Sequence, residues 1–579
     1  MSICRCVSPA DRHEPFPTIV SKPRKMNSQH DLADIAFAPD AFELRALTLP
    51  SVLSCQSARW PKKVFLKELS TGRTFNYREM DAWSGRAARA LQQAGVAKGS
   101  HVGVLMENSA EHVALFFAIG KLGAVSVPFN IAARGELLRY YLSHSDSTTV
   151  IVDASLFDRL SDVLAELPLL ERVIVVGRNE QGVVPSAAGA AVRTFDFESL
   201  MRVAENEIVD QGVRCHDLLM LAFTSGTTGP SKASMLSHAA ALTYGTGAAE
   251  AQGYRSSDVF YVCLPLFHNN ALLASLGSAL VCGASVVLSR RFSVTRFWSE
   301  IRESGCTVTN LLGAMTSFLW GTPPAADDRD NKLRLVSMAP VPKYALEFEQ
   351  RFGLDVMSNY GLSDFGMATS YTGSDPKSKL GSIGRVRRGM QVKIVDDHDF
   401  DVPHEQPGEI VIRCDDPWRA ATGYYKMPEA TLAAHRNQWF HTGDRGICDA
   451  DGYVWFVDRK KDCIRRRGEN ISAFEVEQIL MRHPGVAQVA VFPVNTSTND
   501  EEVGAVIVRH DGHSLSHKEV VEHCQRNMAY FMVPRYVEFR RELPTTANQK
   551  VEKVRLKQDF ERDLSQIWDR EAAGIVLNR

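Results

Sequence analysis

One loop has the residue types and spacing to bind phosphate. Three apolar residues (221–223) lead into a run of hydroxyls and glycines, and Lys232 closes the run. Backbone N–H groups that glycines leave uncovered can wrap a polyphosphate, and the lysine adds a point charge. The spacing differs from that of a Walker A loop, and a flexible surface turn would have a similar composition. The candidate phosphate-binding residues are Thr224, Ser225, Gly226, Thr227, Thr228, Gly229 and Lys232.

Length, charge and cysteine content argue against a single-core protein, a nucleic-acid-binding protein and a disulfide-linked or zinc-binding one. At 579 residues the chain is too long for one hydrophobic core. Its 66 Lys and Arg against 68 Asp and Glu give a net charge of −2, so no basic field favours nucleic acid. The 11 cysteines are scattered without a C-x-x-C pair. This predicts reduced thiols in a cytoplasmic protein and argues against a disulfide framework or a zinc site.

Residues 1–30 are expected to be a disordered extension. They carry positive charges but lack the apolar stretch of a secretory signal. Translation from Met1 and translation from Met26 are both compatible with the sequence.

Residues 268–289 contain no Asp, Glu, Lys or Arg, and the segment is as long as a transmembrane helix. Glycines and polar residues interrupt it, however. We therefore predict a buried helix at 271–282, a helix stop at Gly283 and a buried strand at 284–288, with no transmembrane segment.

The order of predicted elements indicates an α/β fold. Strands and helices alternate from about residue 64 to 152 and again from 259 to 358. Such alternation predicts mostly parallel sheets covered by helices, which bind ligands at the carboxyl ends of their strands. From about Lys379 short strands and turns predict a small distorted β-barrel, and the chain after Lys461 indicates a small α/β lobe.

Five further stretches follow the phosphate loop in an order that resembles the signatures of the adenylate-forming superfamily. That superfamily comprises acyl-CoA synthetases, firefly luciferase and peptide-synthetase adenylation domains. The resemblance implies a large AMP-binding domain (31–460) of stacked sheets plus a barrel, and a mobile C-terminal domain (461–579) with its hinge near Lys461. The five stretches are residues 360–364, 408–413, 442–444, 458–468 and 544–550.

The resemblance implies a two-step ligation. ATP and a carboxylate form an acyl-adenylate and pyrophosphate, and the thiol of coenzyme A then displaces AMP. For the nucleotide, it implies that Asp444 accepts the ribose hydroxyls with help from Arg459, as suits a carboxylate. Tyr360 would face the adenine ring, flanked by Asn359 and Gly361.

The resemblance also implies the catalytic groups. Attack on the α-phosphorus brings two anions together, and the ammonium of Lys550 would offset their repulsion. His268 would lie beside the reacting carboxylate. Ser363 and Asp364 stand where the family usually has Thr and a Mg²⁺-binding Glu. Asp364 keeps a hard oxygen ligand on a shorter side chain, and Ser363 keeps the hydroxyl.

The second step involves the small lobe. The resemblance implies that this lobe rotates about Lys461 after adenylate formation. Gly468 would then let the pantetheine arm pass close to the backbone. The basic run 459–467 would contact the phosphates of coenzyme A, although such a run can equally be a solvated face. Gln549 departs from the glycine that usually precedes the catalytic lysine.

Two kinds of acyl substrate fit the sequence. A small or polar acid fits a pocket rich in hydrogen-bonding groups, and the stretches at 264–270 and 309–315 resemble the crotonobetaine/carnitine–CoA ligase group most. A medium- or long-chain fatty acid is the alternative. The predicted polar pocket residues are Asn269, Asn270, Asn310 and Gly313, beside His268. The apolar residues that support the alternative are Leu272, Leu273, Met315 and Phe318.

Two other functions are weaker alternatives. A peptide-synthetase module is disfavoured because no carrier domain follows and residues 309–315 contain no acid to pair with an amino group. Ser363, Asp364 and Gln549 prompt the hypothesis of a nucleotide-binding protein without turnover, whereas Lys550 and Asp444 argue against it. The expected partners are a small carboxylate, ATP with Mg²⁺, and coenzyme A. The sequence leaves open whether the chain forms a homo-oligomer.

Overall fold

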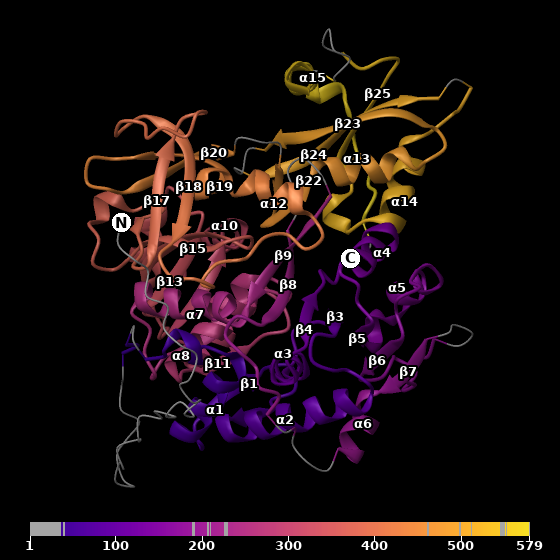
Figure 1. Cartoon of the computed structure of the whole chain (residues 1–579). Coiled ribbons are helices and arrows are strands. Elements are labelled where there is room, and N and C mark those ends of the chain that lie inside the picture. Colours follow the sequence, from indigo (N-terminus) through magenta and orange to yellow (C-terminus); the bar gives the residue numbers. More distant parts are fainter. Residues whose placement is uncertain are drawn as a thin grey trace, which may run out of the picture.

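The computed structural model has a large lobe of two big sheets and a half-barrel, and a smaller C-terminal lobe (Figure 1). The structure describes residues 36–38, 41–187, 192–204, 208, 210–224, 230–459, 463–496, 500–510, 512–544, 551 and 553–577. The predicted α/β architecture is confirmed. The N-terminal extension and residues 460–462 at the predicted domain boundary lie outside the described residues.

A seven-stranded sheet carries the predicted phosphate loop. Its order is β7-β6-β5-β3-β4-β8-β9, and its pairs are parallel except β8–β9. The centre of strand β5 (150–152) is a continuous apolar run, as expected for a parallel strand buried on both faces. The strands are β3 (His101–Leu105), β4 (Val125–Pro128), β5 (Thr149–Asp153), β6 (Arg172–Val176), β7 (Arg193–Asp196), β8 (Leu218–Thr224) and β9 (Lys232–Ser237).

Helices cover both faces of this sheet. Helix α3 begins where the Ser109 side chain accepts a hydrogen bond from the N–H of His112, and it ends at Gly123 with φ +65°. Both are standard end signals for a helix. The helices are α2 (Tyr77–Gln93), α3 (Ala110–Leu122), α4 (Gly135–His144), α5 (Phe157–Ser161) and α6 (Phe197–Val203), with short turns η2 (Ala154–Leu156) and η3 (Leu164–Glu166).

A nine-stranded sheet forms the other half of the large lobe, in the order β16-β15-β14-β13-β12-β10-β11-β1-β2. Helices α1, α3, α7 and α8 pack between the two sheets and share one buried core. The strands are β1 (Val64–Glu68), β2 (Thr74–Asn76), β10 (Val259–Val262), β11 (Ser285–Leu288), β12 (Val308–Leu312), β13 (Leu335–Ala339), β14 (Asp355–Leu362), β15 (Gly366–Tyr371) and β16 (Arg385–Val386). The helices are α1 (Leu49–Arg59), α7 (His238–Gln252), α8 (Gly277–Cys282), α9 (Phe297–Ser304), α10 (Gly313–Trp320) and α11 (Ala345–Phe352), with η1 (Leu44–Ala46) and η5 (Lys377–Lys379).

The uncharged segment 268–289 is a buried helix followed by a strand, as predicted. It begins as a π-helical stretch, η4 (Asn270–Leu276), continues as α8 and stops at Gly283 with φ +71°. Strand β11 follows directly. Across the described ranges, no helix has the length and apolar character needed to cross a membrane.

The half-barrel is a four-stranded antiparallel sheet. This confirms the short strands of a small distorted barrel that were predicted from about Lys379. Its elements are β17 (Met390–Val395), β18 (Pro407–Cys414), β19 (Phe440–Cys448) and β20 (Val454–Arg459), with α12 (Pro428–Ala434) and η6 (Arg436–Gln438).

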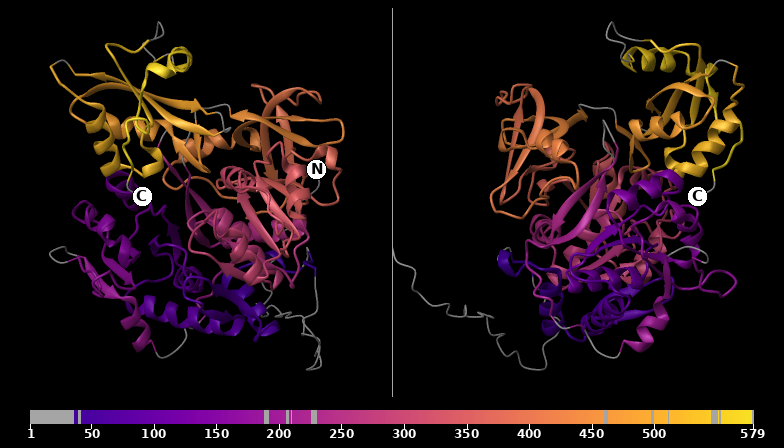
Figure 2. Two further views of the ribbon diagram at one scale, coloured as in Figure 1. Left: turned by 180° about the vertical axis from the view of Figure 1, so that it is seen from behind. Right: turned by 45° about the vertical axis from the view of Figure 1, so that its right-hand side comes forward.

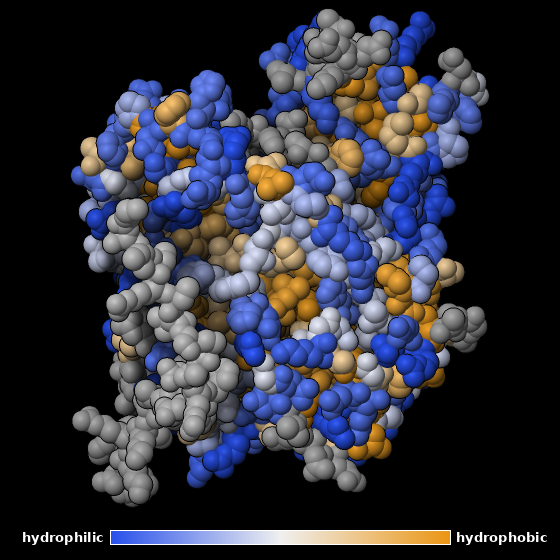
Figure 3. Space-filling view, in the orientation of Figure 1, coloured by the Kyte–Doolittle hydropathy of each residue, from blue (hydrophilic) through white to orange (hydrophobic). Residues whose placement is uncertain are grey.

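The described residues of the C-terminal lobe form a hairpin, a four-stranded sheet and three α-helices. Figure 2 shows this lobe and the half-barrel at the same end of the molecule, and Figure 3 shows the notch between them in a largely hydrophilic surface. The elements are β21 (Cys463–Arg466), β22 (Glu469–Ser472), α13 (Ala473–Met481), β23 (Val486–Asn495), β24 (Glu501–Arg509), α14 (His517–Asn527), η7 (Tyr530–Met532), β25 (Tyr536–Arg540), α15 (Lys553–Arg562), η8 (Leu564–Gln566) and β26 (Trp568–Asp569).

Candidate active site

A cleft of about 1140 Å³ lies between the sheets of the large lobe, the half-barrel and the small lobe. It forms where strands β8, β12 and β14 end, as expected for parallel sheets. Twelve of the predicted site residues line it: Thr224, Lys232, His268, Asn269, Asn270, Asn359, Tyr360, Gly361, Ser363, Asp364, Asp444 and Gly468. Residues 225–229, Lys461 and Lys550 lie outside the described residues, as does the side chain of Arg459.

Tyr360 and Asp444 are brought together from two sheets. Tyr360 lies on β14 and Asp444 on β19, and the Tyr360 hydroxyl donates to Asp444 Oδ2 at 2.8 Å. Only 3% of Asp444 and 9% of Tyr360 is exposed. A Cβ on Gly361 would lie 2.5 Å from the carbonyl oxygen of Gly366, so only glycine fits beside β15. This wall of the cleft is therefore built within the large lobe alone.

Asp364 has a partner that the sequence did not reveal. The hydroxyl of Tyr424 donates to Asp364 Oδ2 at 2.7 Å, and Lys232 Nζ lies 5.0 Å from the centroid of the Tyr424 ring. Burial, and then the charge of Asp364, raise the pKa of Tyr424. In the described part of the chain, no group of three or more His, Cys, Asp or Glu could hold a metal. One carboxylate fits a Mg²⁺ ion held mainly by phosphate oxygens.

The phosphate-loop region is a hairpin between β8 and β9, so the chain returns in an antiparallel strand instead of entering a helix. Thr224 and Lys232 are cross-strand partners at the ends of this hairpin. The sequence predicted the strand and the loop, but not the antiparallel return.

His268 faces the small lobe. Its Nε2 lies 3.1 Å from Oε1 of Glu469, the first residue of β22. Burial lowers the pKa of His268, but the charge and the hydrogen bond of Glu469 together outweigh burial, so the pKa is raised. The neighbouring Gly468 has φ +89°, and a Cβ there would lie 2.7 Å from Cδ1 of Leu312 at the end of β12. The hairpin turn of the small lobe thus closes this side of the cleft.

The four predicted pocket residues divide into two pairs. Asn269 and Asn270 line the cleft, whereas Asn310 and Gly313 are not among its lining residues. Asn310 instead supports Asn270, because its Nδ2 donates to Asn270 Oδ1 at 2.9 Å and to Ser275 Oγ at 3.0 Å. A Cβ on Gly313 would lie 3.1 Å from Cδ of Pro340. Asn310 and Gly313 therefore shape the cleft from behind.

Glu475 is a second residue that sequence reasoning missed. It lies in the first turn of α13, where the N–H of Glu475 donates to the Ser472 side chain, and its Oε1 accepts the backbone N–H of Ser231 at 2.7 Å. Tyr140 donates to the carbonyl of the same Ser231 at 2.7 Å. Burial raises the pKa of Glu475 to about 7. A carboxylate of the small lobe therefore accepts the hydrogen bond of a backbone N–H group, that of Ser231, at the end of the phosphate-loop segment.

Comparison with known proteins decides the family. The AMP-binding enzyme family matches residues 53–425, and the AMP-binding enzyme C-terminal domain matches residues 475–550. The chain belongs to the AMP-binding enzyme family. The predicted membership of the adenylate-forming superfamily is thus confirmed, together with the class of the enzyme, an acid–thiol ligase that binds ATP.

Three relatives illustrate the likeness of this AMP-binding enzyme to others. A crotonobetaine/carnitine–CoA ligase from Salmonella paratyphi A is 30% identical over 492 residues, which cover 84% of this chain and 93% of that protein. A solved double mutant of o-succinylbenzoate CoA synthetase from Bacillus subtilis, bound to a product analogue, has a TM-score of 0.75 at 25% identity, over 87% of this chain and 97% of that one. An anthranilate CoA ligase in complex with anthranoyl-AMP has a TM-score of 0.65 at 25% identity, over 91% and 100%.

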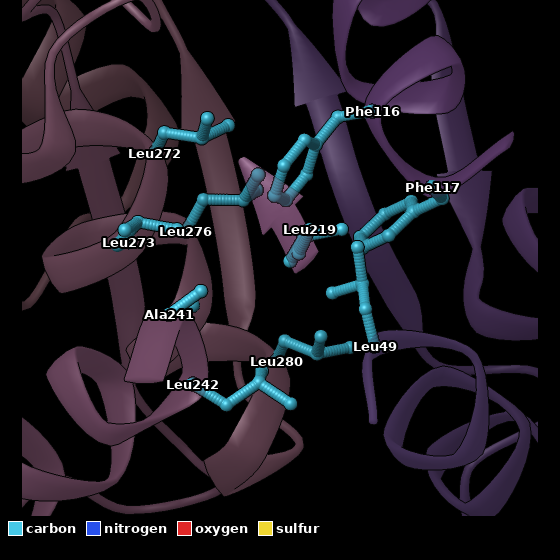
Figure 4. A pocket seen from close by; sticks show the side chains of 11 residues that line it. Leu49, Phe116, Phe117, Leu219, Ala241, Leu242, Leu272, Leu273, Leu276 and Leu280 are labelled. Atoms are coloured by element: carbon cyan, nitrogen blue, oxygen red, sulfur yellow. The ribbon is translucent and has the colours of Figure 1, made fainter. Parts of the chain in front are cut away.

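A separate apolar cavity lies in the core of this AMP-binding enzyme, between α3, β8 and η4. Figure 4 shows Phe116 and Phe117 facing Leu272, Leu273 and Leu276 across it. Its volume is about 10 Å³, roughly that of one water, and its lining is apolar. It is therefore a packing gap and not a ligand site. Leu272 and Leu273 thus face the core, and Phe318 is 51% exposed on α10.

Proposed function

We propose that the chain is an ATP-dependent carboxylate–CoA ligase that acts on a small or polar acid through an acyl-adenylate. The observation that carries this proposal is the composition of the cleft. Buried Asp444 and Tyr360 line it, and so do His268 and the small-lobe turn at Gly468. A nucleotide held by the first pair and an acyl group held beside His268 would share this one cleft.

In the first step, the cleft would place the substrate carboxylate against the α-phosphorus of ATP. Asp444 would accept the ribose hydroxyls, and Lys232 would neutralise phosphate charge near Tyr424. Mg²⁺, held by Asp364 and phosphate oxygens, would supply charge neutralisation. Lys550 would stabilise the charge that develops in the transition state, which is worth several kcal/mol in a dry site.

In the second step, the turn at Gly468 would admit the pantetheine arm. The placement of the small lobe supports this, since Gly468 and Glu469 already lie against Leu312 and His268. The TM-scores also support a small lobe placed for the second step. The neighbour bound to a CoA product analogue scores 0.75, whereas the adenylate-bound neighbour scores 0.65 over a larger share of this chain. We propose that Lys461, between β20 and β21, is the hinge for this movement.

The substrate class rests on the polar wall of the cleft. Asn269 and Asn270 line the acyl side, and Asn310 fixes Asn270. A buried amide left without a partner costs free energy, so this wall favours acids with hydrogen-bonding groups. The carnitine-type relatives support the same class. A fatty acid remains the second candidate, but Leu272 and Leu273 face the packing gap and give it no support from the cleft.

The test is carboxylate-dependent exchange of pyrophosphate into ATP. The panel should contain carnitine, crotonobetaine, short acids, aryl acids and fatty acids of rising length. We expect exchange with short or polar acids and weak exchange with fatty acids. A preference for long fatty acids would overturn the substrate class. Silence across the panel with ATP still bound would favour a non-catalytic nucleotide-binding protein.

Lys550→Ala provides a mechanistic control. We expect it to abolish pyrophosphate formation while ATP binding, measured by calorimetry, persists, because the lysine acts on the developing charge. An active Lys550→Ala variant would remove this residue from the proposed mechanism.

A further inference from the structure

The start of α4 in the large lobe meets the small lobe at the edge of the cleft. Figure 1 shows α4 directly beside α14, and the two helices are in contact. Gly135, the first residue of α4, has φ +47°. A Cβ at this position would lie 2.6 Å from the backbone oxygen of Arg526 and 3.1 Å from Cα of Asn527. Since both obstacles are backbone atoms at the end of α14, only glycine permits this approach.

An ion pair lies next to this close approach. Glu136 Oε2 pairs with Nη1 of Arg482, the residue that ends α13. The Glu136 side chain is only 16% exposed, whereas that of Arg482 is 54% exposed. Glu136 is also held by Arg139 within α4. The Glu136 carboxylate is therefore fixed within the large lobe, and Arg482 of the small lobe contacts it there.

Apolar packing continues across the same junction. Leu137 and Tyr141 of α4 belong to one buried cluster with Ala529, Phe531 and Met532 of the small lobe. The contact thus combines a close backbone approach, a charge pair and a shared core. Interfaces of this kind hold one relative placement of two domains when they are well packed.

The apolar part of the contact borders the cleft, because Leu137, Tyr141, Ala529, Phe531 and Met532 line it, whereas the glycine and the ion pair lie beside it. Among the described residues that line the cleft, neither Gly135 nor Glu136 occurs, and neither lies in a stretch that resembles a family signature. Nothing in the nucleotide wall at Asp444 and Tyr360 depends on this contact, because that wall is built within the large lobe.

We propose that this contact is a latch that positions the small lobe for thioester formation. The latch consists of Gly135 and Glu136 in the large lobe and of Arg482, Arg526 and Asn527 in the small lobe. When it is engaged, the turn at Gly468 and Glu469 lies against Leu312 and His268. The inference rests on the proposed function, and it assigns the latch residues to the second half-reaction and not to adenylate formation.

The central experiment compares Gly135→Ala with Gly99→Ala. Gly99 also has a positive φ, +79°, but nothing lies within 4 Å of a Cβ there. Both variants therefore carry backbone strain, and only Gly135→Ala obstructs the latch. We expect thioester formation from preformed adenylate to fall about tenfold or more in Gly135→Ala relative to Gly99→Ala, as for an overpacked contact. Exchange of pyrophosphate into ATP should stay within about twofold in both variants.

A charge reversal gives an independent variant should Gly135→Ala fold poorly. Glu136→Arg and Arg482→Glu should each slow thioester formation about threefold, and the combined variant should recover most of the loss. Lys518→Glu is the matched control, because among the described residues Lys518 forms an ion pair only with Glu522 on the same helix. It should leave both half-reactions unchanged.

Small-angle X-ray scattering separates a failure of the latch from a failure of the proposed function. The scattering profile of Gly135→Ala should differ from that of the parent and of Gly99→Ala, which reports lobe placement without turnover. Equal loss of both half-reactions in Gly135→Ala would overturn the latch, as would an unchanged profile together with unchanged thioester formation. If no acid supports exchange in the parent, the proposed function fails while the scattering comparison still tests the latch.

Discussion

The proposed nucleotide wall of the cleft is formed by one lobe, whereas the proposed acyl wall is formed by residues of both lobes. Tyr360 and Asp444 come from β14 and β19, both in the large lobe. On the proposed acyl side, His268 is paired with Glu469, and at the end of the phosphate-loop segment the N–H of Ser231 donates to Glu475. Both of these carboxylates belong to the small lobe. The wall of Tyr360 and Asp444 is preorganised, whereas the His268 side and the end of the phosphate-loop segment are complete only when the small lobe is docked.

This difference suits a two-step ligase. In the proposed reaction, groups that bind ATP must stay in place while the small lobe moves, so they belong on rigid strand ends. Groups that meet only in the second step can be divided between lobes, since docking then assembles them when they are needed. Substitutions on the two walls should therefore affect different half-reactions.

Asp444→Asn should give the largest effect. The substitution removes a buried charge that accepts the Tyr360 hydroxyl and, in our proposal, the ribose. A hydrogen bond to a charged group is worth up to ~3 kcal/mol, so kcat/KM for ATP in pyrophosphate exchange should fall roughly 100-fold. Tyr360→Phe, which loses one neutral partner, should fall less. A rate close to that of the parent would remove Asp444 from the nucleotide wall.

Glu475→Gln should change the pH profile of the second half-reaction alone. An acid whose pKa is raised to about 7 by burial in the docked lobe binds more protons there. Docking therefore strengthens as pH falls from about 7 toward 4.5 and weakens as pH rises, by at most about tenfold per pH unit. The raised pKa of His268 acts in the same direction. The pH dependence should be shallower in Glu475→Gln, with the remainder due to His268.

The measurement for Glu475→Gln is single-turnover thioester formation between about pH 5 and about pH 8, with pyrophosphate exchange as the control. Equal slopes in the parent and the variant would show that Glu475 does not titrate on docking.

Glu469→Gln should give a moderate and selective loss. The His268–Glu469 pair is partly exposed, so its charge contributes about 1 kcal/mol or roughly fivefold. Thioester formation should slow by that factor while pyrophosphate exchange keeps its rate. A matching loss in exchange would place the pair in the first step instead, and the contrast between the walls would fail.

Tyr424→Phe should have the smallest effect. It removes the hydrogen bond to Asp364 but leaves the carboxylate and the aromatic face beside Lys232. The Mg²⁺ concentration for half-maximal exchange should shift about twofold to fivefold, as for one neutral hydrogen bond. Thioester formation from preformed adenylate is the control and should not move.

The sequence predicted what depends on local pattern. Apolar runs such as β5 became buried strands, and the uncharged segment before β11 became a buried helix that stops at Gly283. Because parallel strands end at one edge of a sheet, the motifs at Thr224 and Tyr360 could be expected at one cleft.

Contacts between distant segments escaped prediction. Tyr424 and Asp364 are separated by 60 residues, and Ser231 and Glu475 by 244. Glu475 has a local explanation in the sequence, since Ser-x-x-Glu is typical of a helix start, and this hides its role between lobes. Asn310 was expected in the pocket wall, but it lies one layer behind, where it supports Asn270. Only the packing of elements decides such distinctions.

Because Thr224 and Lys232 are cross-strand partners, the sheet holds the lysine independently of the residues that join the two strands. The free energy of closing a loop changes only slowly with its length. Segments of different length or composition could therefore be grafted between these two positions without refolding the strands, while Lys232 stays beside the ring of Tyr424. Thr224 and Lys232 are therefore the natural boundaries of a segment that is to be exchanged between synthetases.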